Sequence, residues 1–248
     1  MHGFLFRSLA GLFVFGSAGA FAAPKHQALF VVLGGYNSCE KSTRTDIIAA
    51  GVPISHSYRT VEKNLRAKHP DTEFKTIFGC LYAEAPPNGE GEYVTSDSPS
   101  HSQSGNAKDV LDEIESAVKK NPKVDIYLVG HSYGGWTTMY LAQELKGSPN
   151  LKLLATIDPI GPECDAVGVV LGDSACHSAP TDLDNKSIKK RAAHWVNFYQ
   201  TEDSWLTSSE IAEANENHHI TFNWGPHGDM DTDDGIWERI EKLIEKVF

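Results

Sequence analysis

The sequence predicts an α/β fold in which a mostly parallel central sheet of about six strands lies between two layers of helices. Apolar, β-branched runs alternate along the chain with runs whose apolar residues recur at helical spacing. A glycine-flanked serine turn, Gly130-His131-Ser132-Tyr133-Gly134, joins one such strand to one such helix. The length of 248 residues suits one substantial domain, which we place at residues 24–248.

Residues 1–23 predict a secretory signal peptide. Arg7 precedes a short apolar stretch, and small residues then lead to an Ala-x-Ala cleavage site near Ala22 or Ala23. The apolar stretch is too short to span a membrane, and its small-residue end argues against an anchor that stays uncleaved. We therefore expect a secreted or periplasmic protein with no stable membrane anchor.

Six segments carry a strand pattern and four carry a helix pattern. The strands are predicted at Gln27–Leu33, Phe74–Tyr82, Val124–Val129, Leu151–Ile157, His194–Gln200 and His219–Phe222. The helices are predicted at Ser57–Lys68, from the N-cap Asn106 to the stop at Asn121-Pro122, at Gly135–Leu145 and from Asp233 onward. The polar stretch Pro86–Ser104 is expected to be a mobile loop, either a substrate-facing flap or a simple excursion.

The turn at Ser132 has the surroundings of a nucleophile elbow. A buried strand precedes the G-x-S-x-G pentapeptide and a helix follows it, which separates this turn from a chance match. So sharp a reversal holds the serine in a strained backbone with its Oγ clear of the sheet. Gly130 and Gly134 leave room where a Cβ would press on the neighbouring elements. Ser132 is therefore the predicted nucleophile, whereas His131 is expected to point away and to be structural.

A serine hydroxyl is a poor nucleophile at neutral pH and needs a base to take its proton. His227 lies on a loop shaped by glycine and proline before the last helix, from which it could reach over the strand ends. It is the favoured base, and His218 or His219 comes next. His177, between two cysteines, and His194, at a strand start, are weaker candidates.

The acid that orients the base has two candidates, both at carboxyl ends of strands, where α/β sites assemble. Asp158 ends a wholly apolar strand, where a carboxylate is costly unless it has a partner, and Pro159 stiffens the turn after it. Asp203 follows a later strand, where it could equally be a loop residue or a helix N-cap. Asp158 is favoured and Asp203 remains the alternative.

Two backbone amides are candidates for an oxyanion hole. The first central strand ends in Gly34-Gly35, a turn that would direct the amide of Tyr36 toward a substrate. The amide of Tyr133, directly after the serine, would be its partner. A plain strand-to-helix turn is the alternative interpretation of the glycine pair.

The four cysteines, Cys39, Cys80, Cys164 and Cys176, favour disulfides in an exported chain. Three pairings are possible, and we favour Cys39–Cys80 and Cys164–Cys176. The second bridge would stabilise the protein by roughly 3 kcal/mol in the chain-entropy model. A metal site is disfavoured, because there is no C-x-x-C and no cysteine at ligand spacing from a histidine.

The charge balance is acidic. The chain has 22 basic and 33 acidic residues, and removal of residues 1–23 takes away Arg7 and leaves a formal charge of −12. Such a charge argues against nucleic acid as a partner and against an electrostatic hold on anionic membranes.

The Gly130–Gly134 elbow, the Gly34-Gly35 turn, Asp158-Pro159 and the late His227 resemble the α/β-hydrolase superfamily, in particular its serine esterases and lipases. Ile157-Asp158-Pro159 is similar to the acid of lipases that place it one strand earlier than most members. The resemblance implies a small, cutinase-like form of the fold. It also implies hydrolysis of a small-molecule or lipid ester through an acyl-enzyme, without a cofactor. We separately expect a monomer.

Two other functions share these features. An acyltransferase or thioesterase would use the same three residues, and a binding protein could retain the scaffold after losing activity. Having all three residue types in the order serine, acid, histidine favours an enzyme. The acyl group and the alcohol of the substrate are not indicated by any motif.

Overall fold

The computed structural model describes residues 26–35, 53–81, 91–96, 103–147, 149–162, 164, 176–202, 206–221 and 226–248. The predicted signal peptide, Tyr36, Cys39 and the alternative acid Asp203 lie outside the described residues. Among the described residues, no helix combines the length and apolarity needed to cross a bilayer.

A central sheet of eight strands runs through the described part of the chain, in the order β10-β8-β6-β5-β1-β2-β3-β4. The six strands from β10 to β2 are mutually parallel. They are β1 (His26–Gly34), β2 (Thr72–Leu81), β5 (Asp125–His131), β6 (Asn150–Ile157), β8 (His194–Tyr199) and β10 (Glu216–His219). This architecture confirms the predicted α/β class with a mostly parallel sheet.

Two additional strands correct the predicted count of about six. β3 (Gly91–Thr95) and β4 (Gln103–Gly105) extend the sheet by antiparallel pairing from β2. β3 falls inside the Pro86–Ser104 stretch that was expected to be a loop, and β4 begins within it. β3 is held because Tyr93 and Val94 enter the cores on opposite faces of the sheet, the alternation of a strand. A separate two-stranded sheet pairs β7 (Cys176–His177) with β9 (Leu206–Thr207).

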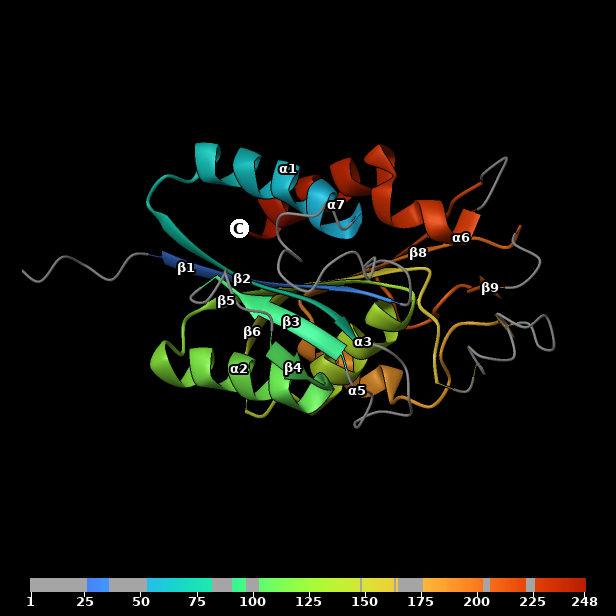
Figure 1. Ribbon diagram of the computed structural model, residues 1–248, viewed down its shortest axis with the longest axis horizontal. Coiled ribbons are helices and arrows are strands. Elements are labelled where there is room, and N and C mark those ends of the chain that lie inside the picture. The colour runs from blue at the N-terminus through green and yellow to red at the C-terminus, as the bar shows by residue number, and fades with distance from the viewer. Residues whose placement is uncertain are drawn as a thin grey trace, which may run out of the picture.

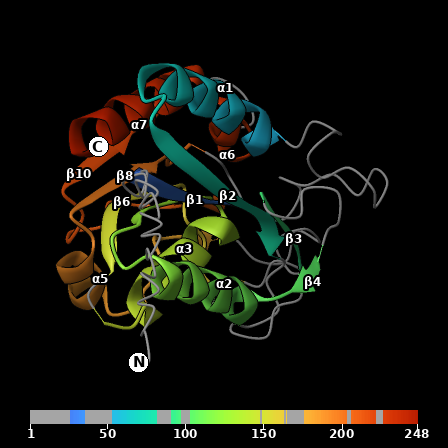
Figure 2. The ribbon, with the colours of Figure 1, turned by 90° about the vertical axis from the view of Figure 1, so that its left-hand side faces the viewer.

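Helices cover both faces of the sheet, as Figures 1 and 2 show. One layer contains α1 (Pro53–Lys68), α6 (Pro226–Asp229) and α7 (Asp234–Val247), with the short 3-10 helix η1 (Met230–Thr232) between the last two. The other layer contains α2 (Ala107–Lys120), α3 (Tyr133–Glu144) and α5 (Asn185–Arg191).

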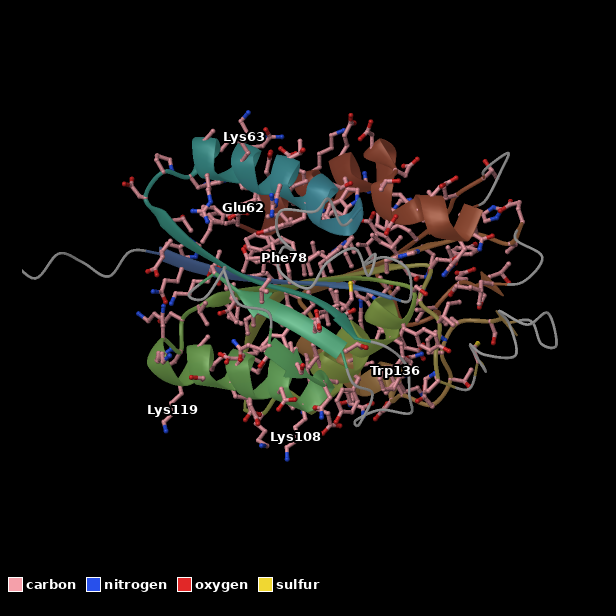
Figure 3. All side chains as sticks on the ribbon, viewed as in Figure 1. Glu62, Lys63, Phe78, Lys108, Lys119 and Trp136 are labelled. Atoms are coloured by element: carbon pink, nitrogen blue, oxygen red, sulfur yellow. The ribbon has the colours of Figure 1, made fainter. Side chains whose placement is uncertain are left out.

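The residues of β1 show how the layers are joined. Phe30 and Val32 pack toward α1 and α7, whereas Val31 and Leu33 pack toward α2 and α3. A strand that is apolar on both faces must lie in the middle of a covered sheet, which explains the continuous hydrophobic run at Gln27–Leu33. In Figure 3, Phe78 of β2 lies between the sheet and α1, while Lys63, Lys108 and Lys119 project outward from the helices.

Local signals determine several element ends. Asn106 caps α2, because its side chain accepts hydrogen bonds from the backbone amides of Lys108 and Asp109. The Asp109 carboxylate in turn accepts from the Asn106 amide, which completes a capping box. Asp233 caps α7 through the amide of Ile236, as its position predicts. α1 begins at Pro53, earlier than the predicted Ser57, because proline suits the first turn of a helix.

The last strand differs from its predicted position. β10 occupies Glu216–His219 and pairs with β8, whereas the sequence pattern favoured His219–Phe222. The observed strand is polar, which an edge strand tolerates because only one side of it is paired within the sheet. The predicted position was wrong because it was based on the apolar residues Ile220 and Phe222, which follow the observed strand.

Candidate active site

Ser132 lies at the carboxyl end of β5, where the chain turns into α3. Its backbone has φ 57° and ψ −129°, a left-handed conformation that is strained for a residue with a side chain. The Ser132 amide donates to the Ile157 carbonyl at 3.0 Å, and the Ser132 carbonyl accepts from Ile160 at 3.1 Å. The turn is thus tied on both sides to the end of β6.

Close packing explains the two glycines of the pentapeptide. A Cβ on Gly130 would lie 2.2 Å from the Gly134 carbonyl oxygen, and one on Gly134 would lie 2.2 Å from the carbonyl oxygen of Leu33. Real Cβ atoms do not approach backbone oxygens so closely. The elbow can therefore pack between β1 and α3 only because both positions lack a side chain.

His227 joins the serine to Asp158. Its Nε2 lies 2.9 Å from Ser132 Oγ, and its Nδ1 lies 2.7 Å from Asp158 Oδ2. A carboxylate oxygen accepts, so Nδ1 carries the proton, and Nε2 is left to accept from the serine hydroxyl. Ser132 is 4% exposed, His227 8% and Asp158 0%. The residues predicted as nucleophile, base and acid thus form one buried, hydrogen-bonded row.

Asp158 is surrounded by donors. Besides His227, the side-chain amide of Gln200 donates to Oδ2 at 2.7 Å, and the backbone amides of Ser208 and Gln200 donate to Oδ1 at 3.0 and 3.4 Å. A buried carboxylate requires such partners, because an unpaired charge in the interior is costly. Asp158 itself has φ 43°, a left-handed conformation that aspartate tolerates better than most residues.

The other candidate histidines with described side chains have different partners. His194 and His218 contact Glu216 at 3.1 and 3.0 Å, and His219 contacts Glu202 at 3.2 Å. These contacts lie at the β10 edge of the sheet. These histidines, which were alternatives to His227 as the base, are therefore paired with glutamates. The side chain of His177 lies outside the described residues.

The Tyr133 amide, one of the two oxyanion candidates, lies beside a close contact between Gly35 and Ser132. A Cβ on Gly35 would come within 2.8 Å of Ser132 Oγ and 2.9 Å of the Tyr133 nitrogen. The end of β1 therefore meets the elbow beside both the hydroxyl and the Tyr133 amide. Tyr36, the other predicted donor, follows Gly35 directly but lies outside the described residues.

Tyr133 is also held by its side chain. Its hydroxyl donates to the Cys164 carbonyl at 2.5 Å, and the ring packs in a small buried cluster with Ile160 and Cys164. Cys164 and Cys80 are both disulfide-bonded, and no described cysteine is free. Cys39 and the side chain of Cys176 lie outside the described residues, so the favoured pairing stays a prediction.

Two neighbours of the row carried no signal in the sequence. Gln200 follows β8 as an ordinary polar residue, and nothing in the surrounding pattern marks it as a partner of an acid. His131 was recognisable only as a neighbour of the serine. Among the described residues, no cluster of histidine, cysteine, aspartate and glutamate side chains could hold a metal ion.

The strand order, the crossover helices on both faces and the strained serine turn after β5 are those of an α/β-hydrolase fold. The fold predicted from the sequence motifs is thereby confirmed.

Comparison with known proteins gives distant likenesses only. No protein-family model and no curated protein matches the chain. Est1E from Butyrivibrio proteoclasticus, solved with ferulic acid bound, is 14% identical over 90% of each chain, with a TM-score of 0.49. The ydeN product of B. subtilis is 11% identical over 88% of this chain and 99% of its own, with a TM-score of 0.45. A putative hydrolase from Agrobacterium vitis is 13% identical over 91% and 90%, also at 0.45. Such likenesses say nothing of substrate or mechanism.

Proposed function

We propose that this chain is an exported serine hydrolase that cleaves carboxylic esters through an acyl-enzyme. The observation that carries the proposal is the row in which Ser132 Oγ lies 2.9 Å from His227 Nε2 and His227 Nδ1 lies 2.7 Å from Asp158 Oδ2. A nucleophile, a base and an orienting acid within hydrogen-bond reach are the arrangement that serine hydrolysis requires.

In the first half of the proposed reaction, the Ser132 hydroxyl attacks the ester carbonyl carbon while His227 Nε2 takes its proton. The resulting imidazolium is supported by the Asp158 carboxylate, whose other donors hold it in place. His227 then gives the proton to the departing alkoxide oxygen, and the carbon–oxygen bond of the ester breaks. The alcohol leaves and the acyl group remains on Ser132.

In the second half, water replaces the alcohol. His227 takes a proton from the water as its oxygen attacks the acyl carbon, and returns that proton to Ser132 Oγ when the bond to the serine breaks. In both halves the carbonyl oxygen becomes negative. The Tyr133 amide, held by the Tyr133–Cys164 hydrogen bond, and the Tyr36 amide are the proposed donors to it.

A fluorophosphonate probe tests the nucleophile directly. We expect the folded protein without residues 1–23 to be labelled once, with the label on Ser132 by peptide mapping, and the variant Ser132→Ala to be unlabelled. Hydrolysis of p-nitrophenyl esters of increasing acyl length should disappear in the same variant and reveal the preferred acyl size. Wild-type hydrolysis by Ser132→Ala would refute the proposal.

Export is the second part of the proposal. It is supported by the leader-like composition of residues 1–23 and by the disulfide-bonded state of Cys80 and Cys164, which suits an oxidising compartment. Expression of the full chain in a bacterium, followed by N-terminal sequencing of the extracytoplasmic fraction, should give a protein that begins near Ala23 or Pro24. Full-length protein confined to the cytoplasm would contradict this.

A further inference from the structure

The side chains of His131 and Ser132 both form hydrogen bonds with His227. Ser132 Oγ lies 2.9 Å from the ring nitrogen Nε2 of His227, and the Nε2 atom of His131 lies 2.8 Å from the His227 carbonyl oxygen. The centroids of the two imidazole rings are 4.9 Å apart, and the ring planes are at 35° to each other. The Ser132 side chain thus contacts the ring of His227, and the side chain of its neighbour His131 contacts the main chain of His227.

The direction of the His131 hydrogen bond follows from its chemistry. Burial, and then the neighbouring His227, lower the pKa of His131 to about 3, so that its ring is neutral at ordinary pH. A neutral imidazole has one N–H, and a carbonyl oxygen can only accept. The proton is therefore on Nε2, which donates to His227. The other nitrogen, Nδ1, faces the buried Asp231 carboxyl at 3.7 Å.

The place of His227 in the fold explains why such a bond matters. It lies on α6, a helix of four residues, and so short a helix has little stability of its own. The residue that follows, Gly228, is exposed, and a Cβ there would contact nothing within 4 Å. By contrast, every residue of β5 is buried. The His131 bond therefore fastens a weak helical turn to a central strand of the sheet.

We propose that His131 is a positioning residue for the base: its hydrogen bond to the His227 carbonyl sets the distance between His227 Nε2 and Ser132 Oγ. This inference rests on the proposed function and adds a role to the variable position of the G-x-S-x-G turn. His131 acts through His227 and needs no contact with substrate. An error of about 1 Å in the placement of a reacting group can cost about 100-fold in rate.

Three substitutions at position 131 separate the hydrogen bond from the volume of the ring. His131→Gln puts an amide nitrogen near the place of Nε2, His131→Asn puts one near the place of Nδ1, and His131→Leu has no donor. With a p-nitrophenyl ester, we expect kcat to fall about 10- to 100-fold in the Leu and Asn variants, with KM within about twofold of wild type. The Gln variant should recover most of the loss.

The coupling to the base is tested in a second background. In His227→Ala, which retains only residual hydrolysis, His131→Leu should lower kcat no further, because the group it positions is absent. His194→Gln, on β8 and paired with Glu216, is the matched control for a polar histidine lost elsewhere. It should leave kcat unchanged. Thermal unfolding of each variant identifies effects of stability alone.

Several outcomes would overturn the proposal. Wild-type kcat in His131→Leu, equal losses in the Gln and Asn variants, or a further full loss in the His227→Ala background would each remove the positioning role. If His131→Leu does not fold, the comparison of Gln with Asn still decides. The proposed function fails separately, if Ser132→Ala or His227→Ala hydrolyses the ester at the wild-type rate.

Discussion

The side-chain amide of Gln200 donates to Asp158 Oδ2, the same carboxylate oxygen that accepts from His227. Both distances are 2.7 Å, and Gln200 is as fully buried as Asp158. The Gln200 side chain also donates to the Leu206 carbonyl and accepts from the Glu202 amide, so its orientation is determined. Gln200 therefore keeps the Asp158 carboxylate in place, as the proposed reaction requires when His227 gains and loses its proton.

Substitution of Gln200 by Glu should impair catalysis strongly. A second buried carboxyl would then face Asp158 where a donor stood, which removes a hydrogen bond to a charged group worth about 1.5–3 kcal/mol. We expect kcat/KM for a p-nitrophenyl ester to fall by about 10- to 100-fold. Gln143→Glu is the control: Gln143 is half-buried on α3, its Oε1 accepts from the Asp184 amide, and glutamate keeps such an acceptor, so the variant should match wild type. Equal activity of the two variants would show that the Gln200 amide is dispensable.

The two candidate acids can be separated by matched amide substitutions. Asp158→Asn keeps the shape of the side chain but has no negative charge to support the His227 imidazolium, and we expect kcat to fall by about 10⁴-fold. Asp203→Asn should leave kcat nearly unchanged. Steady-state kinetics on the same ester checks both. An inactive Asp203 variant beside an active Asp158 variant would reverse the assignment.

Gly134→Ala should destabilise the protein. Its Cβ would lie 2.2 Å from the Leu33 carbonyl oxygen, so either β1 or the elbow has to move. Overpacking of this kind costs about 1–3 kcal/mol or more, which corresponds to a Tm lower by roughly 2–12 °C in a protein of this size. Gly228→Ala, which has open space around its Cβ, is the control for Tm. Equal melting temperatures would contradict the close approach.

His131 should make the folded state sensitive to acid. Its pKa is lowered by burial to about 3 in the folded protein, whereas an unfolded histidine titrates near 6.5. Between about pH 3 and pH 6.5 the unfolded chain binds more protons at His131 than the folded protein does, so the free energy of unfolding rises with pH. As the pH falls below about 6.5, His131 therefore lowers the free energy of unfolding by at most about 1.4 kcal/mol per pH unit.

The acid sensitivity is measurable by urea unfolding at about pH 7 and about pH 5. His131→Gln should lose less free energy of unfolding between these two conditions than wild type does. His227 and Asp231 are the titratable groups in contact with His131, and they are unchanged in this comparison. A pH dependence identical to that of wild type would show that His131 does not carry it.

The disulfide pairing can be read from unreduced peptide masses. We expect Cys39 joined to Cys80 and Cys164 joined to Cys176. The predicted Cys164–Cys176 bridge includes the residue whose carbonyl accepts from the Tyr133 hydroxyl. Because the Tyr133 amide is a proposed oxyanion donor, reduction of this bridge should also lower kcat. A Cys39–Cys164 peptide, or free thiols at Cys80 or Cys164, would reject the pairing.

Much of the fold was predictable because it depends on strong local signals. The central strands are apolar on both sides, and α2 and α7 have clear helical stripes with capping residues at Asn106 and Asp233. The elbow was predictable for a different reason: few turns permit a strand, a left-handed serine and a helix in immediate succession. These signals placed the strand ends where the site assembles.

The parts that were missed depend on contacts between distant residues. β3 could not be recognised because only Tyr93 and Val94 mark it within a polar stretch, and the pairing with β2 decides its structure. Gln200 and His131 become informative only when the fold brings them to Asp158 and His227. A hydrogen bond between residues almost a hundred positions apart has no trace in local sequence.

The left-handed backbone at Asp158 also restricts how this protein can change over evolutionary time. Besides glycine, asparagine is the residue that most readily takes this conformation, and both are one nucleotide change from aspartate. Neither can support a charged base, yet asparagine would leave the sheet and the surroundings of Ser132 in place. On the proposed function, the easiest change at this position therefore leads from a hydrolase to a folded protein that binds an ester and does not cleave it.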